Sequence, residues 1–426
     1  MSLALEGIKV IDVSQVAAVP MCARHLADFG ADVLHIENPR TGDSWRVYQA
    51  NQESSNYLAP SHINYNWENY NRNKRSVTID LSQEGGQKII HRLLEQADVF
   101  VSNLRPFELE RFKLEYETLR KLNPRLIYGG VTGYGRKGLE KDAPAYDTTA
   151  YWTRSGIPYM LTTPGLPGPG FRAAFGDNVA ALALAYGVMV ALYVREKTGV
   201  GQEIDVALFH MGMYQLSLDI AGALATGLDA TDWRVQPPED MVAGARAAML
   251  PLTVFYRSLA MNPLSMAYIT KDGRVILFVA LQPDRYWGKF CRAIGREDLE
   301  DDPRFNSLDA RAENREILYP ILDEIFMSKT LDEWKPLLEG IPYAPHQSVL
   351  EAINDPVARA NEYFVAYDHP NYGRIEALAN PVKLSKTPAT VRMPAPEFSQ
   401  HTEEVLLEYG YTWEDIAQFK EKGIIA

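Results

Sequence analysis

Strands and helices alternate along the first third of this 426-residue sequence, and the alternation restricts the possible folds more than any other feature. Short apolar runs, typical of buried strands, are separated by helical segments such as Met21 to Phe29 and Gly85 to Gln96. The strands are predicted at residues 8–13, 32–37, 76–81, 99–101 and 126–131. Strands joined by helices build right-handed β-α-β units and hence a parallel sheet. We therefore predict an α/β fold whose ligands bind at the carboxyl ends of these strands.

The character of the chain changes after this region. A nearly uncharged helical run, Val179 to Val194, precedes an irregular stretch that begins near residue 227. Residues 266–279 form a predicted hairpin with an Asp-Gly turn, which indicates a small separate domain. Further elements are predicted as a strand at 203–207, a helix at 286–294 and two final helices at 402–409 and 413–422.

Charge and cysteine content argue against several classes of function. The formal net charge of -12 disfavours nucleic acid or an anionic membrane as the main partner. Cys22 and Cys291 match no metal or redox spacing, and the eight histidines are scattered, so no metal site is expected. The first residues lack the features of a signal peptide, and no uncharged apolar run reaches membrane-spanning length. A soluble cytoplasmic protein is expected.

Asp177 is the residue on which the functional hypothesis depends. The chain has no G-x-S-x-G elbow, P-loop, H-E-x-x-H or C-x-x-C motif, which leaves carboxylates, basic residues and glycine-rich turns. Asp177 follows Gly176 and precedes the uncharged helical run, and from local sequence alone the role of helix cap outweighs catalysis. The same position also suits a nucleophile, because helix amides can stabilise an oxyanion and Gly176 leaves room for substrate.

Basic residues flank two of the predicted strands. Lys74 and Arg75 precede the third strand, and Arg105 follows the fourth. Such side chains can grip the phosphate oxygens of a nucleotide. They can equally be solvated strand ends, and the residues themselves leave both interpretations open.

Taken together, these fragments resemble the class III CoA-transferases of the CaiB/BaiF type, which include formyl-CoA transferase and carnitine CoA-transferase. The matching motifs lie at residues 5–12, 26–33, 42–46, 73–76, 97–99, 103–106, 123–127, 198–202 and 401–406. Each motif is weak alone, but their common order over essentially the whole chain is specific.

The resemblance implies an architecture and a mechanism. Residues 1–225 and 331–426 would form a Rossmann-like large domain from both chain ends, 226–330 a linker and a smaller α+β domain, and two copies an interlocked homodimer. Asp177 would be a covalent nucleophile that forms an aspartyl anhydride and an aspartyl-CoA thioester. The partners would be an acyl-CoA and a carboxylic acid, with coenzyme A as a co-substrate and no permanently bound cofactor or metal.

The resemblance also implies contacts with CoA. Val16, Ala17 and Ala18 would lie beside the thioester, Lys74, Arg75 and Arg105 near the nucleotide, and Tyr146 at the same site. Some members close a glycine-rich loop over the aspartate, whereas residues 259–264 of this chain contain no glycine run.

Two alternatives remain beside the transferase. Racemases of the same fold carry a His-Asp step where this chain has Tyr146-Asp147, and a neutral tyrosine with a pKa near 10 is a poor partner for reversible proton transfer. A non-catalytic CoA-binding protein would keep the basic residues and lose Asp177, which is present. The transferase is therefore favoured, while the exchanged acids are not defined by the sequence.

Overall fold

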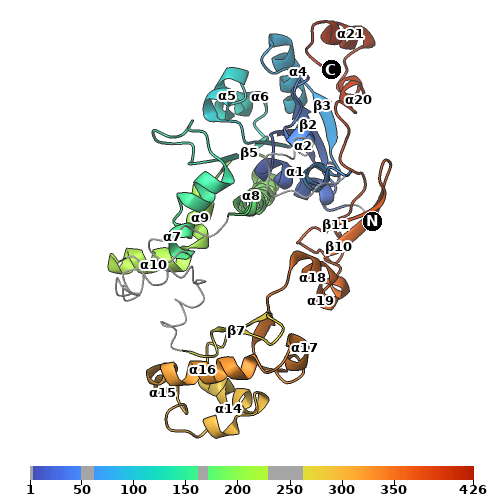
Figure 1. Ribbon diagram of the computed structural model, residues 1–426. Coiled ribbons are helices and arrows are strands. Elements are labelled where there is room, and N and C mark those ends of the chain that lie inside the picture. Colours follow the sequence, from blue (N-terminus) through green and yellow to red (C-terminus); the bar gives the residue numbers. More distant parts are fainter. Residues whose placement is uncertain (1–2, 49–61, 162–170, 229–261) are drawn as a thin grey trace. The chain divides into compact units, whose positions relative to one another are not determined.

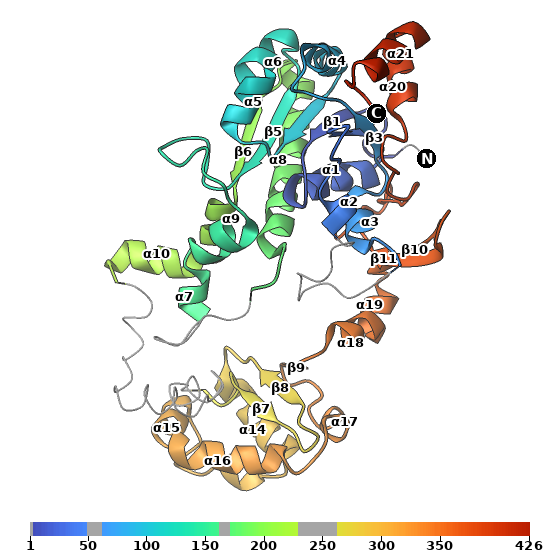
Figure 2. The same cartoon turned by 45° about the horizontal axis from the view of Figure 1, so that its top comes forward.

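The structure is a computed structural model that describes residues 3–48, 62–161, 171–228 and 262–426. These residues form two compact units (Figures 1 and 2). Described residues of the first unit lie within Met1–Met160, Pro169–Gly227 and Asn361–Ala426, and those of the second are Leu161 and residues within Leu228–Ala360. The first unit thus combines both ends of the chain. Half of the stretch 259–264, which contains no glycine run, lies outside the described residues, because they resume at residue 262.

A six-stranded sheet is the framework of the first unit. Its strands are β1 (Lys9–Val13), β2 (Asp32–Glu37), β3 (Arg75–Thr78), β4 (Val99–Ser102), β5 (Ile127–Thr132) and β6 (Glu203–Ala207). Their order is β3-β2-β1-β4-β5-β6, and every neighbouring pair is parallel. The predicted α/β fold with a parallel sheet is confirmed. The strand order reverses between β1 and β4, where a crevice for ligands opens at the carboxyl edge.

Helices cover both faces of this sheet. Val10 faces a core formed with α1 (Ala18–Asp28), α3 (Tyr65–Asn71) and α8 (Phe175–Thr198). Its neighbour Ile11 points to the opposite core because side chains alternate along a strand. That second core includes α4 (Glu84–Glu95), α5 (Pro106–Phe112), α6 (Tyr116–Leu122), α20 (Thr402–Glu408) and α21 (Trp413–Glu421). The two predicted final helices are confirmed, and they close one side of the sheet.

Smaller elements complete the first unit. They are α2 (Trp45–Tyr48), the π-helix η2 (Thr148–Thr153), α7 (Ile157–Leu161), α9 (Leu208–Gln215), α10 (Ser217–Thr226) and a hairpin of β10 (Phe364–His369) and β11 (Gly373–Leu378). The returning C-terminal segment is bonded to β3, since His401 N donates to Ser76 O at 3.0 Å and Ala426 N to Thr78 Oγ1 at 3.0 Å.

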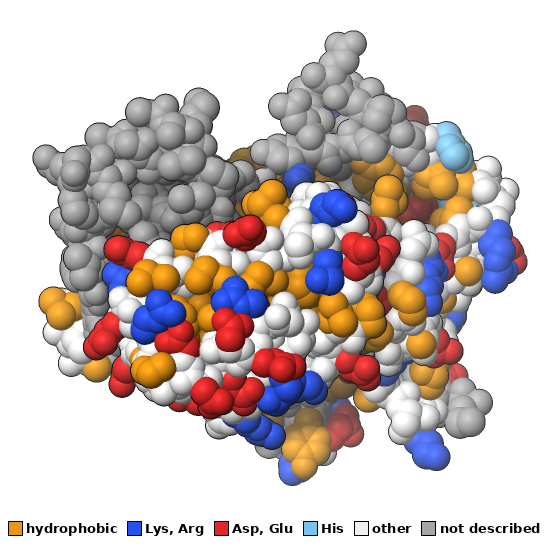
Figure 3. Space-filling view, turned by 60° about the horizontal axis from the view of Figure 1, so that its bottom comes forward, with side chains coloured by type: hydrophobic (Ala, Val, Ile, Leu, Met, Phe, Trp, Pro, Cys, Tyr) orange, Lys and Arg blue, Asp and Glu red, His pale blue; other side chains and the backbone are white. Residues whose placement is uncertain are grey.

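The second unit is a small α+β fold. The predicted hairpin is present as β7 (Ala267–Ile269) and β8 (Val275–Phe278), and β9 (Tyr343–Pro345) extends the antiparallel sheet. Its helices are α14 (Pro283–Ala293), η3 (Glu297–Leu299), α15 (Leu308–Glu313), α16 (Arg315–Phe326), α17 (Leu331–Trp334), α18 (Val349–Asn354) and α19 (Pro356–Ala360). Aromatic side chains fill the core, with Phe326 packed against Tyr268 and Trp334. On the face shown in Figure 3, acidic and basic side chains are interspersed among the described residues rather than segregated.

Helix α8 is longer than the apolar run predicted from the sequence, which is too short to span a membrane. By length and composition it is the one helix among the described residues that could cross a membrane, because the helix starts earlier and ends later than the predicted apolar run. Within the first unit it packs against α1 and β5 and contributes Ala181, Leu184 and Val188 to the core. Core helices of globular folds pass the same test.

Candidate active site

A cavity of about 380 Å³ lies at the carboxyl edge of the parallel sheet and includes Asp177. Its walls come from the β1–α1 turn, the β4–α5 turn, the end of β5 and the loop before η2. The lining residues are Gln15–Ala18, Asn103–Pro106, Glu108, Val131–Gly133, Lys141, Ala143–Asp147, Asp177 and Leu208. Five of the predicted contact residues, namely Val16, Ala17, Ala18, Arg105 and Tyr146, thus share a cavity with Asp177.

Asp177 does not cap α8, contrary to the local prediction. The helix begins at Phe175, so Asp177 lies in its first turn, and the cap residue Ala174 makes no side-chain bond. The capping acceptor is Asp147, whose Oδ1 accepts from Gly176 N at 2.7 Å and Asp177 N at 3.2 Å. Among the described residues, no hydrogen bond or ion pair to the Asp177 carboxylate is found, so that group is left free to react.

Gly176 makes this arrangement sterically feasible. A Cβ at this position would collide with the Asp147 carboxylate and with the ring of Tyr151. Only glycine therefore lets Asp147 approach the first amides of α8. The space beside Gly176, predicted to hold substrate, is occupied by the Asp147 carboxylate and the Tyr151 ring.

Both carboxyl groups have a raised pKa. Burial first, and the charge of Asp147 second, raise the pKa of Asp177 to about 7. Burial also raises the pKa of Asp147, although the amides of Gly176 and Asp177 oppose that shift. Asp177 is therefore a carboxylate whose ionised form is poorly solvated, and such a group is a stronger nucleophile than an exposed one.

Two cationic side chains line the cavity. The Arg105 guanidinium pairs with Glu108 at 3.2 Å and stacks on the Phe107 ring at 4.5 Å, and its side chain is 42% exposed. Lys141 lines the same cavity, with an exposed fraction of 44%. Both can reach an anionic ligand. Sequence reasoning missed Lys141, because the loop that carries it has no recognisable pattern.

Lys74 and Arg75 do not contribute to this cavity. Lys74 is fully buried, and its Nζ donates to Asp12 Oδ2 at 2.9 Å and Asn71 Oδ1 at 2.8 Å. Arg75 opens β3, at the amino edge of the sheet, and pairs with Asp32 at 2.7 Å and Glu408 at 2.9 Å. The predicted nucleotide contact is therefore corrected, because carboxylates of the fold already neutralise both charges.

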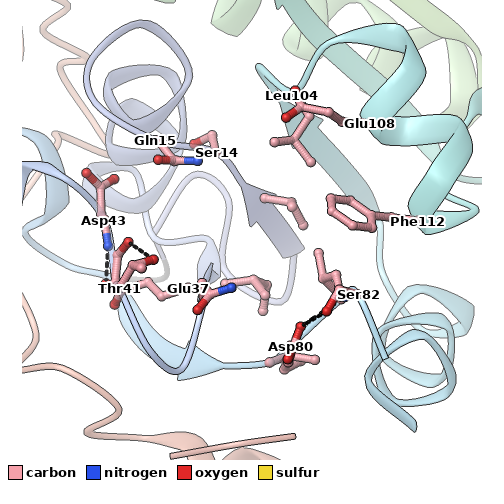
Figure 4. A pocket seen from close by; sticks show the side chains of 16 residues that line it. Ser14, Gln15, Glu37, Thr41, Asp43, Asp80, Ser82, Leu104, Glu108 and Phe112 are labelled. Atoms are coloured by element: carbon pink, nitrogen blue, oxygen red, sulfur yellow. Dashed lines mark hydrogen bonds between the residues drawn. The ribbon is translucent and has the colours of Figure 1, made fainter. Parts of the chain in front are cut away.

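A second cavity, of about 180 Å³, adjoins the first along the same edge of the sheet (Figure 4). Gln15, Leu104 and Glu108 line both cavities. Carboxylates and hydroxyls surround the second one, and its polar lining residues are Ser14, Gln15, Glu37, Asn38, Thr41, Asp43, Asp80, Ser82 and Glu108. Among the residues that the structure describes, neither lysine nor arginine lines it. This lining suits amino and hydroxyl groups better than phosphates.

Asp147 is the main site residue that sequence reasoning did not assign. In the sequence, Tyr146-Asp147 stands out only as a difference from the racemases. Its contact with α8 joins residues 29 positions apart, which no local pattern reveals. Among the described residues, no group of three or more potential metal ligands is present.

Comparisons with known proteins identify relatives over nearly the whole chain. The family model described as "CoA-transferase family III" matches residues 5–402. The (R)-2-hydroxy-4-methylpentanoate CoA-transferase of Clostridioides difficile is 36% identical, with 99% of each chain covered. The cinnamoyl-CoA:phenyllactate CoA-transferase of Clostridium sporogenes is 31% identical over 98% of this chain and 97% of its own. A crystal structure of a CaiB/BaiF family protein from Brucella suis superimposes with a TM-score of 0.76 at 26% identity, covering 96% of this chain and 100% of that one.

Proposed function

The chain belongs to CoA-transferase family III, and from that premise we propose that it moves CoA between an acyl-CoA and a carboxylic acid through covalent intermediates on Asp177. The observation that carries the proposal is the Asp177 carboxylate. It is unpaired among the described residues, lines the cavity at the sheet edge and has a raised pKa.

The proposed reaction is a sequence of four acyl exchanges. The Asp177 carboxylate attacks the thioester carbonyl, the C–S bond breaks, and a mixed anhydride and CoA thiolate form. The thiolate attacks the aspartyl carbonyl and releases the donor acid, which leaves an aspartyl-CoA thioester. The acceptor carboxylate attacks this thioester and expels the thiolate, and the thiolate attacks the new acyl carbonyl to give acyl-CoA and free Asp177. Each step exchanges one acyl bond for another of similar energy.

The groups around Asp177 support these steps. Ala17 and Ala18 bring the start of α1 to the cavity, where the first helix amides have no partner within the helix. Such amides are suited to stabilise the oxyanion of each tetrahedral intermediate. Asp147 holds the backbone of Gly176 and Asp177, and it thereby fixes the direction of the nucleophile.

The two adjoining cavities would hold CoA along the sheet edge. The thioester would lie in the cavity with Asp177, and Arg105 and Lys141 would contact anionic groups of the cofactor. The adenosine would enter the cavity of Figure 4, where Asn38 and Asp80 can accept from its amino and hydroxyl groups. Tyr146 lines the first cavity, and its side chain is largely exposed. It would pack against the part of CoA that links the thioester to the adenosine.

The acids exchanged are proposed to be 2-hydroxy acids with branched or aromatic side chains. Relatives at 36% and 31% identity are named for (R)-2-hydroxy-4-methylpentanoate and phenyllactate. Before Asp177, Trp152 packs against Phe171 and Phe175, with ring centroids 5.8 and 5.7 Å apart. These three aromatic residues are not among the residues that line the cavity with Asp177, so the proposal rests on the named relatives.

A homodimer is proposed from the exposed side of α8. Leu182, Tyr186, Met189 and Tyr193 follow a helical spacing, and the two tyrosines are 73% and 63% exposed. A second copy of the chain would cover this apolar row. Light scattering should give a dimer mass that Tyr186→Glu lowers, while Val349→Glu, at an equally exposed apolar position of the second unit, leaves it unchanged. A monomer mass for the native protein would contradict the proposal.

One assay separates the transferase from the racemase. The protein is incubated with isotopically labelled 2-hydroxyacyl-CoA thioesters, including 2-deuterated ones, together with free acids. Transfer of CoA to the free acid with full retention of the deuterium supports the proposal. Loss of deuterium without transfer would support a racemase instead. Asp177→Asn should abolish transfer while its CD spectrum stays native.

A further inference from the structure

Val16 adopts a backbone conformation that is unfavourable for its side chain. It lies between β1 and α1 with φ of +68°, in the left-handed region. β-branched residues enter this region only at a conformational cost, and they persist there when the surroundings hold them. Val16 lines the cavity that contains Asp177, as do Ala17 and Ala18 after it. The strained residue therefore begins the segment that faces the nucleophile.

Asp43 holds this turn from the β2–α2 loop. Val16 N lies 3.2 Å from Asp43 Oδ2 and 3.3 Å from Oδ1, and Trp45 N donates to Oδ1 at 2.8 Å. The preceding residue is fixed independently, because Gln15 N donates to Asn103 Oδ1 at 3.1 Å and Asn103 Nδ2 donates to Gln15 O at 2.8 Å. Figure 4 shows Asp43 on the loop that faces Ser14 and Gln15.

Asp43 belongs to a row of buried charged side chains that also includes His35, Asp12 and Lys74. His35 Nε2 lies 3.5 Å from Asp43 Oδ2, and His35 Nδ1 lies 2.8 Å from Asp12 Oδ2. Lys74 Nζ approaches the same Asp12 oxygen at 2.9 Å. All four side chains are at most 1% exposed. They come from β1, β2, the β2–α2 loop and the residue before β3. The row of charged side chains therefore extends across the three neighbouring strands β1, β2 and β3.

Charge balance explains why this group can be buried. Asp12 and Asp43 carry two negative charges, and Lys74 with a protonated His35 carries two positive ones. Burial by itself lowers the pKa of His35, but Asp12 and Asp43 outweigh it and raise that pKa to about 9. The Asp43 carboxylate therefore has a cationic ring nitrogen of His35 3.5 Å away on one side, while its oxygens accept from Val16 N and Trp45 N on the other.

We infer that Asp43, supported by His35, positions the strained Val16–Ala18 turn against Asp177 and thereby sets the rate of acyl transfer to that aspartate. Asp43 and His35 are positioning residues that act through the turn. The inference rests on the proposed function for its kinetic part, whereas the restraint of the turn itself is independent of the reaction.

The test compares Asp43→Ala with a matched control. The control is Glu68→Gln. Like Asp43, Glu68 is a buried carboxylate that contacts a histidine and a backbone amide, with His369 Nε2 at 3.2 Å and Ala395 N at 3.1 Å. Unlike Val16, it lies outside the Asp177 cavity. Acylation is followed with acyl-CoA and hydroxylamine, which converts an aspartyl anhydride or thioester into a hydroxamate at Asp177. Affinity for free CoA and hydrogen–deuterium exchange of the peptide with Val16 are measured on the same samples.

Asp43→Ala should slow hydroxamate formation by about 10- to 100-fold, the effect of a small displacement near the reacting atoms, and should speed exchange at the turn. Affinity for free CoA should change little, and Glu68→Gln should acylate at the native rate. Adding Val16→Gly to Asp43→Ala should recover part of the rate, because glycine adopts the left-handed conformation without restraint. If Asp43→Ala does not fold, Asp43→Asn, which keeps the volume, replaces it in the comparison.

Native acylation and exchange rates in Asp43→Ala, or an equal loss of acylation in Glu68→Gln, would overturn the inference. Absence of hydroxamate in the native protein would instead refute the proposed function. In that case the rate of hydrogen–deuterium exchange in the peptide with Val16, compared between the native protein and Asp43→Ala, still decides whether Asp43 restrains the turn.

Discussion

The acylation of Asp177 should depend on pH with a midpoint far above that of an ordinary carboxylate. Burial first, and the Asp147 charge second, raise its pKa from 3.8 to about 7. The shift corresponds to roughly 4 kcal/mol in favour of the neutral form. Because only the ionised form is nucleophilic, about one tenth of the protein is competent at pH 6 and nearly all of it at pH 8. The rate of hydroxamate formation should therefore rise through about pH 7 and then level off.

Asp147→Asn tests the origin of this shift. The substitution removes a negative charge next to Asp177, and the asparagine oxygen can still accept from Gly176 N. The midpoint should move to lower pH, yet it should stay above 3.8 because burial, the larger cause, remains. Asp205→Asn, which alters a partly exposed carboxylate of β6 outside the cavity, should leave the midpoint in place. A flat profile around neutral pH, or a midpoint unaffected by Asp147→Asn, would refute this reasoning.

Three further predictions follow from the contacts of the site. Gly176→Ala should lower both the melting temperature and the acylation rate, because its Cβ collides with the Asp147 carboxylate; unchanged values in thermal scans and trapping would contradict this. Arg105→Ala should raise KM for acyl-CoA about 10-fold in steady-state assays by loss of one charged contact, whereas Arg120→Ala, in a similarly spaced surface pair, should not. His35 has a folded-state pKa of about 9, above its ordinary 6.5, so its contribution to the free energy of unfolding is complete below pH 6.5 and is lost as pH rises through about 9. Urea titrations should show this loss in the native protein and not in His35→Gln.

Local patterns were enough to predict the framework of the fold. The strands of the parallel sheet and the Asp-Gly hairpin are each encoded within a few residues, since short apolar runs and turn chemistry are local features of the sequence. The hairpin turn at Asp272–Gly273 is an example, because Gly273 has a φ of +73°.

The corrected predictions concern contacts between distant residues. Lys74 and Arg75 form a basic cluster in the sequence, but Asp12, the partner of Lys74, lies 62 residues earlier on a non-adjacent strand. Asp177 has the local sequence of a helix cap, yet Asp147 takes that role from 30 residues away. Side-chain partners of this kind depend on strand order and helix packing, which local sequence does not specify.

The central claim is that Asp177 becomes covalently linked to the substrate, and oxygen exchange tests it most directly. In the proposed sequence the acceptor carboxylate attacks the aspartyl-CoA thioester, and the final attack by the thiolate leaves the bridging oxygen on Asp177. A single turnover with an acceptor acid whose two carboxylate oxygens are oxygen-18 should therefore place one heavy oxygen atom in the peptide that contains Asp177 and in no other peptide, and repeated turnover should place up to two there. If turnover proceeds, the label remains entirely in the acyl-CoA and free acid, and every enzyme peptide keeps its native mass, Asp177 is not the covalent nucleophile.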